Sequence, residues 1–174
     1  MSTSSEMPRH GARVRRARTL YIVDIENLKG AGAMSDADSH LIRKTLFELF
    51  PRRPEDLVVV GSGCNQSLLA SRIWTGARLV FRKGHNGADL ALLDVLKNEN
   101  VAQRFDRLVL ASGDGIFTGI VRRLANEGMS IHQVGVTDHV SRALSEAADE
   151  SVRIISPSWI YPHASRTIEL TQAA

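Results

Sequence analysis

The sequence RLVLASGDGIFTGIVRRLANEGMSIHQVGV, at residues 107–136, sets the class of fold. It begins with an apolar strand at 107–112, turns through Gly-Asp-Gly into an amphipathic helix at 116–128, and ends in a second apolar strand at 130–136. Gly128 lies where the helix should end, because glycine is favoured just past a helix C-terminus. A strand, a helix and a strand in this order predict two parallel strands joined by a right-handed crossover.

The chain from Thr19 onward repeats this alternation of strand and helix. Further strands are predicted at 19–24, 56–61, 77–82 and 151–156. Further helices are predicted at 40–50, 67–74, 88–98 and 141–149. The strands are nearly continuous apolar runs, which is typical of parallel strands that are buried on both faces. We therefore predict one α/β domain, built as a doubly wound, mostly parallel sheet with helices on both faces.

Composition favours a cytoplasmic protein with one folded domain. A length of 174 residues is close to the usual size of a single domain. The single cysteine, Cys64, cannot form an internal disulfide, which is typical of a reducing compartment. The longest apolar runs, such as residues 57–60, are far shorter than the ~20 residues that a membrane-spanning helix needs. We expect a cytoplasmic localisation and no membrane partner.

Basic residues are concentrated at the amino end of the chain. Residues 1–18 hold five arginines and one acid, a net charge of +4, while the rest of the chain holds 17 basic and 18 acidic side chains, a net charge of −1. Residues 1–18 are predicted to be a disordered basic arm, followed by the folded domain at 19–156 and a C-terminal tail at 157–174. The serines and arginines of the arm are also found in organellar transit peptides. Any attraction to a polyanion should depend on this arm.

Three carboxylates are predicted to meet at one edge of the sheet. Asp24 ends the first strand, Asp114 follows the fourth strand, and Asp89 lies at the start of a helix that follows the third. In doubly wound sheets, ligands bind outside the carboxyl ends of the strands. Carboxylates that are brought together repel one another unless a cation offsets their charge. Because oxygen ligands suit Mg²⁺ or Mn²⁺, we expect one of these cations as a cofactor.

Four stretches of the chain, spread over about residues 19–156, together resemble the NYN branch of the PIN-like ribonucleases. Their order along the chain and their places on the predicted strands and helices agree with that family. They read YIVDIENL (21–28), NGADLALLDVL (86–96), LVLASGDGIFTGIVRRLANEGMSIHQVG (108–135) and SRALSEAADESVRI (141–154). The resemblance implies a PIN-like (Rossmannoid) three-layer sandwich.

The resemblance also implies a function. It predicts an endoribonuclease that depends on a divalent metal and hydrolyses RNA phosphodiester bonds to 5′-phosphate and 3′-hydroxyl ends. Asp24, Asp89 and Asp114 would be the catalytic metal ligands. Asn27 would hold the geometry around Asp24 or contact substrate, and Ser112 would orient Asp114. RNA is the partner that follows, and a homo-oligomer or a protein partner is compatible with the sequence.

Other residues near these motifs have two interpretations. Arg82, Lys83 and His85 precede the acidic residue Asp89, so they either contact phosphates or belong to a solvated loop. Glu26 follows Asp24 by two residues and either contacts the metal or belongs to a solvated loop, which is its expected setting. Three aromatic side chains are expected to pack in the core or the tail, because no aromatic cluster marks a base-stacking surface; they are Trp74, Phe117 and Trp159.

The three aspartates also have structural interpretations. Asp24 could end its strand by accepting hydrogen bonds from nearby backbone N–H groups. Asp114 could cap the helix that follows it. Asn86 and Asp89 have the spacing of a helix N-cap and an acid three residues later, which stabilises a helix start without any chemistry.

One position departs from the family pattern. Family members commonly read Ser-Gly-Asp-x-Asp-Phe, and Ile116 stands here where the second aspartate would be. Isoleucine cannot bind a metal, so the alternative is a catalytically impaired domain that binds RNA or a protein partner. Asp94 and Asp149 are candidate replacements, but Asp94 lies five residues past Asp89, roughly 140° around a helix, and should point elsewhere.

Overall fold

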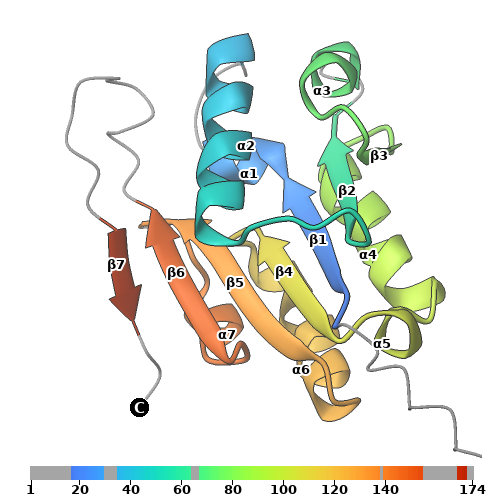
Figure 1. The fold of residues 1–174 in the computed structure, drawn as a ribbon, viewed down its shortest axis with the longest axis vertical. Helices are drawn as coiled ribbons and strands as arrows, with labels where there is room; N and C mark the ends of the chain where they lie inside the picture. Colours follow the sequence, from blue (N-terminus) through green and yellow to red (C-terminus); the bar gives the residue numbers. More distant parts are fainter. Residues whose placement is uncertain (1–16, 30–34, 64–66, 138, 155–167, 172–174) are drawn as a thin grey trace, which may run out of the picture.

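The structure is a computed structural model that describes residues 17–29, 35–63, 67–137, 139–154 and 168–171. These residues form one seven-stranded sheet with the order β3-β2-β1-β4-β5-β6-β7, in which the first six strands are parallel and β7 is antiparallel to β6 (Figure 1). The strands are β1 (Thr19–Asp24), β2 (Leu57–Ser62), β3 (Arg78–Phe81), β4 (Arg107–Ala111), β5 (Ser130–Val136), β6 (Glu150–Ile154) and β7 (Ile168–Thr171). The predicted fold class is confirmed.

Helices cover both faces of the sheet. One face carries α1 (Ile25–Lys29), α2 (Asp36–Leu49) and α3 (Ser67–Ile73). The other face carries α4 (Gly87–Asn98), α5 (Val101–Arg104), the 3-10 helix η2 (Gly115–Phe117), α6 (Thr118–Asn126) and α7 (Arg142–Ser145). The two groups of helices lie on opposite sides of the strands in Figure 1, and the result is a three-layer sandwich.

Each face of the sheet has its own hydrophobic core, and β1 contributes to both. Leu20 and Ile22 pack into the cluster beneath α4 and α6, while Tyr21 and Val23 pack into the cluster beneath α1, α2 and α3. Successive side chains of a strand point to opposite faces, so a strand that is covered on both sides must be apolar throughout. This explains the unbroken apolar runs of the sequence.

The structure adds three elements that were not predicted and lengthens one that was. The additions are α1, α5 and β7, and β7 lies within the segment expected to be a C-terminal tail. Helix α2 starts at Asp36, four residues before the predicted start. There the Ser35 side chain accepts a hydrogen bond from Asp38 N–H while the Asp38 carboxylate accepts from Ser35 N–H, a capping box that stabilises the helix start.

Some predictions fall outside the described residues, and others can be checked directly. Residues 1–16, Cys64 and Trp159 are outside. Trp74 and Phe117 are buried and pack in the core as expected. Within the described part of the chain, no helix combines the length and the apolar character needed to cross a bilayer.

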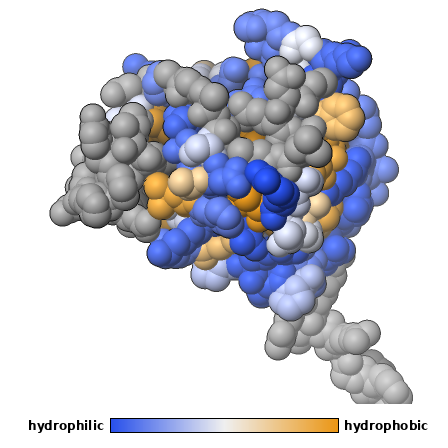
Figure 2. Space-filling view, turned by 90° about the horizontal axis from the view of Figure 1, so that it is seen from above, coloured by the Kyte–Doolittle hydropathy of each residue, from blue (hydrophilic) through white to orange (hydrophobic). Residues whose placement is uncertain are grey.

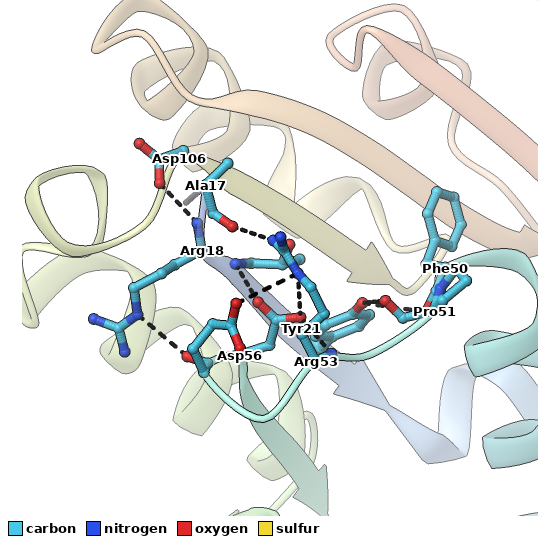
Figure 3. Close-up of polar contacts among 10 residues, drawn as sticks. Ala17, Arg18, Tyr21, Phe50, Pro51, Arg53, Asp56 and Asp106 are labelled. Atoms are coloured by element: carbon cyan, nitrogen blue, oxygen red, sulfur yellow. Dashed lines mark hydrogen bonds and ion pairs between the residues drawn. The ribbon is translucent and has the colours of Figure 1, made fainter. Parts of the chain in front are cut away.

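The amino end of β1 is held by a set of polar contacts (Figure 3). Buried Asp56 accepts hydrogen bonds from the backbone N–H groups of Thr19 and Arg53, each at 2.8 Å. Asp106 accepts from Arg18 N–H at 2.8 Å. The Tyr21 hydroxyl donates to the Phe50 and Pro51 carbonyls at 3.1 and 3.3 Å, and burial, followed by the charge of Asp56, raises its pKa from 10.0 to about 12.

Replacing Asp56 with alanine should lower the free energy of unfolding by about 2–3 kcal/mol. The change leaves the backbone N–H groups of Thr19 and Arg53 without their charged acceptor in a buried place. Glu55→Ala is the matched control: Glu55 lies 3.9 Å from the same arginine but is partly exposed, so its loss should cost less than about 1 kcal/mol. Urea unfolding of the two variants measures both values, and equal losses would show that the anchor does not depend on Asp56.

Candidate functional site

The strand order reverses between β1 and β4. β1 pairs with β2 on one side and with β4 on the other, and the chain moves outward from it in both directions. In open parallel sheets, the crevice outside the carboxyl ends of the strands at this reversal is where ligands bind. Figure 2 looks down on this end of the molecule, where hydrophilic residues make up much of the described surface.

A pocket of about 520 Å³ lies at this crevice. Four carboxylates line it, those of Asp24, Glu26, Asp89 and Asp114. The rest of the described lining consists of Asn27, His85, Asn86, Ala88 and His139. The structure thus brings the three predicted aspartates to one pocket, from the end of β1, from the first turn of α4 and from the loop after β4.

Asp24 is the most deeply placed of these side chains, with 2% of its surface exposed. It is the last residue of β1, and α1 starts at the next residue. One carboxylate oxygen accepts a hydrogen bond from the Asn27 backbone N–H at 3.1 Å, and the other accepts from the Ser112 hydroxyl at 3.3 Å. The expected bond to nearby backbone therefore exists, but it satisfies only one of the two oxygens.

The carboxyl groups of Asp24 and Asp89 lie within hydrogen-bonding reach of each other. Two such groups can share a hydrogen bond only when one of them is protonated, and they repel each other when both are ionised. Burial raises the pKa of the Asp24 carboxyl well above its ordinary value of 3.8, and the hydrogen bond and negative charge of Asp89 raise it further. The Asn27 N–H and the Ser112 hydroxyl lower that pKa, but they do not outweigh the burial. A cation bound between the two carboxyl groups would therefore offset the repulsion between their negative charges.

The start of α4 gives Asp89 no role as part of a capping box. Asn86, the residue before the helix, has a left-handed backbone with φ of 56° and caps the helix with no side-chain hydrogen bond. Asp89 is in the first turn, where its charge suits the helix dipole. The carboxyl group of Asp89 interacts with Asp24. The capping-box interpretation therefore explains neither the Asn86 side chain nor the Asp89 side chain.

The loop after β4 is tied to α1 and to Asp24. Gly113 N–H donates to the Asn27 side-chain oxygen at 2.7 Å, and Asp114 N–H donates to the Ser112 hydroxyl at 3.2 Å. One oxygen of Asp114 accepts from Ile116 N–H at 2.9 Å and caps η2. The capping interpretation of Asp114 is therefore correct as far as it goes, while the same side chain also lines the pocket.

Four residues that the sequence offered as candidates lie outside the described lining of the pocket. They are the two predicted phosphate contacts and the two acids considered as replacements for the missing aspartate. Arg82 pairs with Asp94 at 3.5 Å, both more than half exposed, and neither Arg82 nor Lys83 is part of the described lining. Asp94 faces a different groove, as its helical position predicted. Asp149 accepts a hydrogen bond from Ile131 N–H at 2.7 Å. Neither acid takes the place that Ile116 leaves open.

Three residues of the site were missed or misjudged from sequence. Glu26 is tied down rather than solvated, because its carboxylate accepts from Gly63 N–H at 2.7 Å. His139 is exposed on the pocket wall, and nothing in its local sequence indicates that. Gln133 is fully buried on β5, where its side-chain nitrogen donates to the Ser112 carbonyl at 2.8 Å. Its signal was an amide among the apolar residues Ile131, Val134 and Val136 of the strand.

The residues fit a divalent cation in part. Among the side chains that the structure describes, no group of three or more His, Cys, Asp or Glu is arranged to hold a metal ion. Asp24 and Asp89 nevertheless place two carboxyl groups close enough to interact, and a cation between them would offset their charge. Asp114 and Glu26 face the same pocket, each with one oxygen bonded to a backbone N–H. Oxygen-only donors of this kind suit Mg²⁺ or Mn²⁺.

Comparison with known proteins agrees with this fold. The family model of the NYN domain matches residues 71–155, a range that includes Asp89 and Asp114 and excludes β1. NYN domains have the PIN-like nuclease fold. The crystal structure of a protein of unknown function from Vibrio parahaemolyticus has the same fold, with 17% identity, a TM-score of 0.57 and coverage of 82% of this chain and 95% of that one. No curated protein matches this chain.

Proposed function

Taking residues 71–155 as an NYN domain, we propose that the protein is a divalent-metal-dependent endoribonuclease of a reducing, cytoplasmic compartment. The observation that carries the proposal is the convergence of the Asp24, Asp89 and Asp114 carboxyl groups on one pocket at the reversal point of the sheet. The domain that acts spans 19–156, and its substrate is an RNA phosphodiester.

The residues of the pocket divide into three roles. Asp24 and Asp89 would hold Mg²⁺ or Mn²⁺, with Asp114 as the third carboxylate at the same pocket. When bound, such a cation supplies charge that polarises a phosphate and lowers the pKa of a water molecule. Asn27 and Ser112 fix the relative positions of α1 and the loop after β4 through the hydrogen bonds at 2.7 and 3.3 Å. Arg82 and Lys83 are exposed and would meet phosphates outside the pocket.

A second function, RNA or protein binding without cleavage, is favoured by Ile116. This side chain is 37% exposed, directly after the loop that carries Asp114, and offers no ligand atom. Asp114 meanwhile uses one oxygen to cap η2. A domain of this kind would bind RNA with an affinity that falls steeply with salt and on deletion of residues 1–18. It would not cut RNA at any concentration of Mn²⁺.

Asp89→Asn, compared with Asp94→Asn, tests the enzyme directly. Both aspartates are on α4, but Asp94 forms an exposed ion pair away from the pocket. With Mn²⁺ or Mg²⁺ and a set of single-stranded and structured RNAs, we expect Asp89→Asn to cut about 10²–10³-fold more slowly than the unchanged protein. Asp94→Asn should cut within about twofold of it, because a surface ion pair contributes little.

The outcomes separate the two functions. Loss of cutting in Asp89→Asn alone supports the nuclease. Binding of RNA without cutting by the unchanged protein supports the second function, and equal cutting by both variants would place the reaction elsewhere.

A further inference from the structure

We infer that Gln133 is a positioning residue that holds the loop Ser112-Gly113-Asp114 in place against Asp24. The expected effect of Gln133 on metal binding rests on the proposed function. Its effect on the position of the loop rests only on its own hydrogen bonds. Gln133 does not touch the pocket itself. It acts through the backbone of Ser112.

Gln133 is fully buried, and both ends of its amide are used. The side-chain nitrogen donates to the Ser112 carbonyl at 2.8 Å. The side-chain oxygen accepts from the Ser151 hydroxyl at 2.5 Å. In the sheet, Gln133 is opposite Leu110 of β4 and Ser151 of β6. It therefore ties the strand that carries the loop to a strand two places away.

Gln133 lies at a fully buried position of β5, and this makes its amide informative. Burying an amide in a core costs free energy unless it is hydrogen-bonded, and a leucine or methionine would fill the same space without that requirement. The chain also makes room for the amide at Gly135. A Cβ atom there would lie 2.7 Å from the side-chain nitrogen of Gln133 and would overlap Val140. Gln133 makes the hydrogen bond to Ser112, and Gly135 leaves the space that the Gln133 side chain needs.

The contact reaches the pocket through one residue. The carbonyl of Ser112 is held by Gln133, and the hydroxyl of the same residue donates to Asp24 at 3.3 Å and accepts from Asp114 N–H at 3.2 Å. A shift of the Ser112 backbone would therefore displace its hydroxyl group, which bonds to both the Asp24 carboxylate and the Asp114 N–H. Partners of metal ligands that act in this way typically change metal affinity by about 10–100-fold.

The test uses Gln133→Met, which keeps the length of the side chain and removes both hydrogen bonds. Ile131→Val is the matched control, because it truncates a buried residue of the same strand that makes no side-chain hydrogen bond. Two quantities are measured: the dissociation constant for Mn²⁺, and the amide hydrogen exchange of Gly113 in the metal-free protein, which reports the bond from Gly113 N–H to Asn27.

We expect Gln133→Met to weaken Mn²⁺ binding by about 10–100-fold and to speed the exchange of Gly113 by about tenfold. The control should leave both values within about twofold, because Ile→Val is a mild core change. The inference is overturned if Gln133→Met behaves as the control does. If Gln133→Met does not fold, Ser151→Ala takes its place, since it releases only the far end of the amide. A smaller increase in Gly113 exchange supports the inference, and an unchanged rate overturns it.

The two readouts keep this inference separate from the proposed function. If the unchanged protein binds no Mn²⁺ and cuts no RNA, the nuclease proposal fails, while Gly113 exchange still tests Gln133. If the unchanged protein is an active nuclease and Gln133→Met changes neither readout, the inference about Gln133 fails alone.

Discussion

Asp24→Asn should abolish metal-dependent cleavage and, in the absence of metal, make the protein more stable. For cleavage we expect a loss of at least about 10³-fold, because the variant removes a charge that the proposed cation site needs while it keeps nearly the same shape. An asparagine oxygen can still accept from Asn27 N–H, and its amide can still meet Ser112, so the pocket should keep its form.

The gain in stability follows from the raised pKa of Asp24. A carboxyl group whose pKa is higher in the folded than in the unfolded protein favours folding at low pH. That contribution is lost as the pH rises from the ordinary value of 3.8 through the higher value of the folded protein. At pH 7 the unchanged, metal-free protein therefore bears a cost that Asp24→Asn does not have. The difference between the two should shrink as the pH is lowered towards 4.

Thermal unfolding with and without Mn²⁺ measures both effects. A cation that binds only the folded state stabilises it by about 2.7 kcal/mol at a concentration of 100 times its dissociation constant. For a chain of this size that corresponds to a rise in Tm of roughly 5–10 °C. The unchanged protein and Asp94→Asn should show this rise, and Asp24→Asn should not. A lower Tm for metal-free Asp24→Asn at pH 7, together with an undiminished response to Mn²⁺, would contradict the site.

Gly113→Ala is the second change with a large expected effect. A Cβ atom at Gly113 would overlap the carbonyl oxygen of His139 and would lie 3.1 Å from the Cα atom of Val140. These are backbone atoms, so no side-chain rotation can relieve the overlap. Gly113 is also fixed on both sides, because its N–H donates to Asn27 and its carbonyl accepts from Ser141 N–H at 2.8 Å.

We expect Gly113→Ala to lower the free energy of unfolding by about 2–4 kcal/mol and cleavage by about 10²-fold or more, because a small displacement of catalytic groups is costly. Gly119→Ala is the control. Gly119 is exposed on α6 with no atom near its Cβ position, and alanine is the better helix former, so a gain of about 0.5–1 kcal/mol is expected. Chemical denaturation and an RNA cleavage assay give the two values. If Gly113→Ala is as stable and active as the unchanged protein, the loop is not constrained as described.

Much of the fold could be predicted because its strands are apolar on both faces. The bounds of β1 and β5 agree with prediction residue for residue. The elements that were missed are short, and α1, with five residues, is too brief to show a helical period. The early start of α2 had a signal in Ser35 and Asp38, the spacing of a capping box. β7 has four residues, and its pairing with β6 is a tertiary contact that no local pattern indicates.

The sequence predicts which side chains of the site lie at the ends of strands, but it does not predict their hydrogen-bond partners. Topology places the carboxyl ends of parallel strands at one edge, so Asp24 and Asp114 were expected there. The partner of each carboxylate depends on backbone geometry between strands far apart in sequence. For this reason neither the contact of Glu26 with Gly63 nor that of Gln133 with Ser112 was predicted. Ile116 was identified from the motif, and the structure adds that Asp114 caps its backbone.

The contacts around Asp56 and Asp106 hold the first strand at the end remote from the pocket. A six-residue strand with a rise of ~3.3 Å per residue is about 20 Å long, so residues 1–16 join the domain that far from the carboxylates. An oligonucleotide that just fills the pocket would not extend to this junction. Under the proposed function, an RNA that extends about 20 Å beyond the pocket would reach the point where the basic arm joins the domain, so the arm would favour longer substrates.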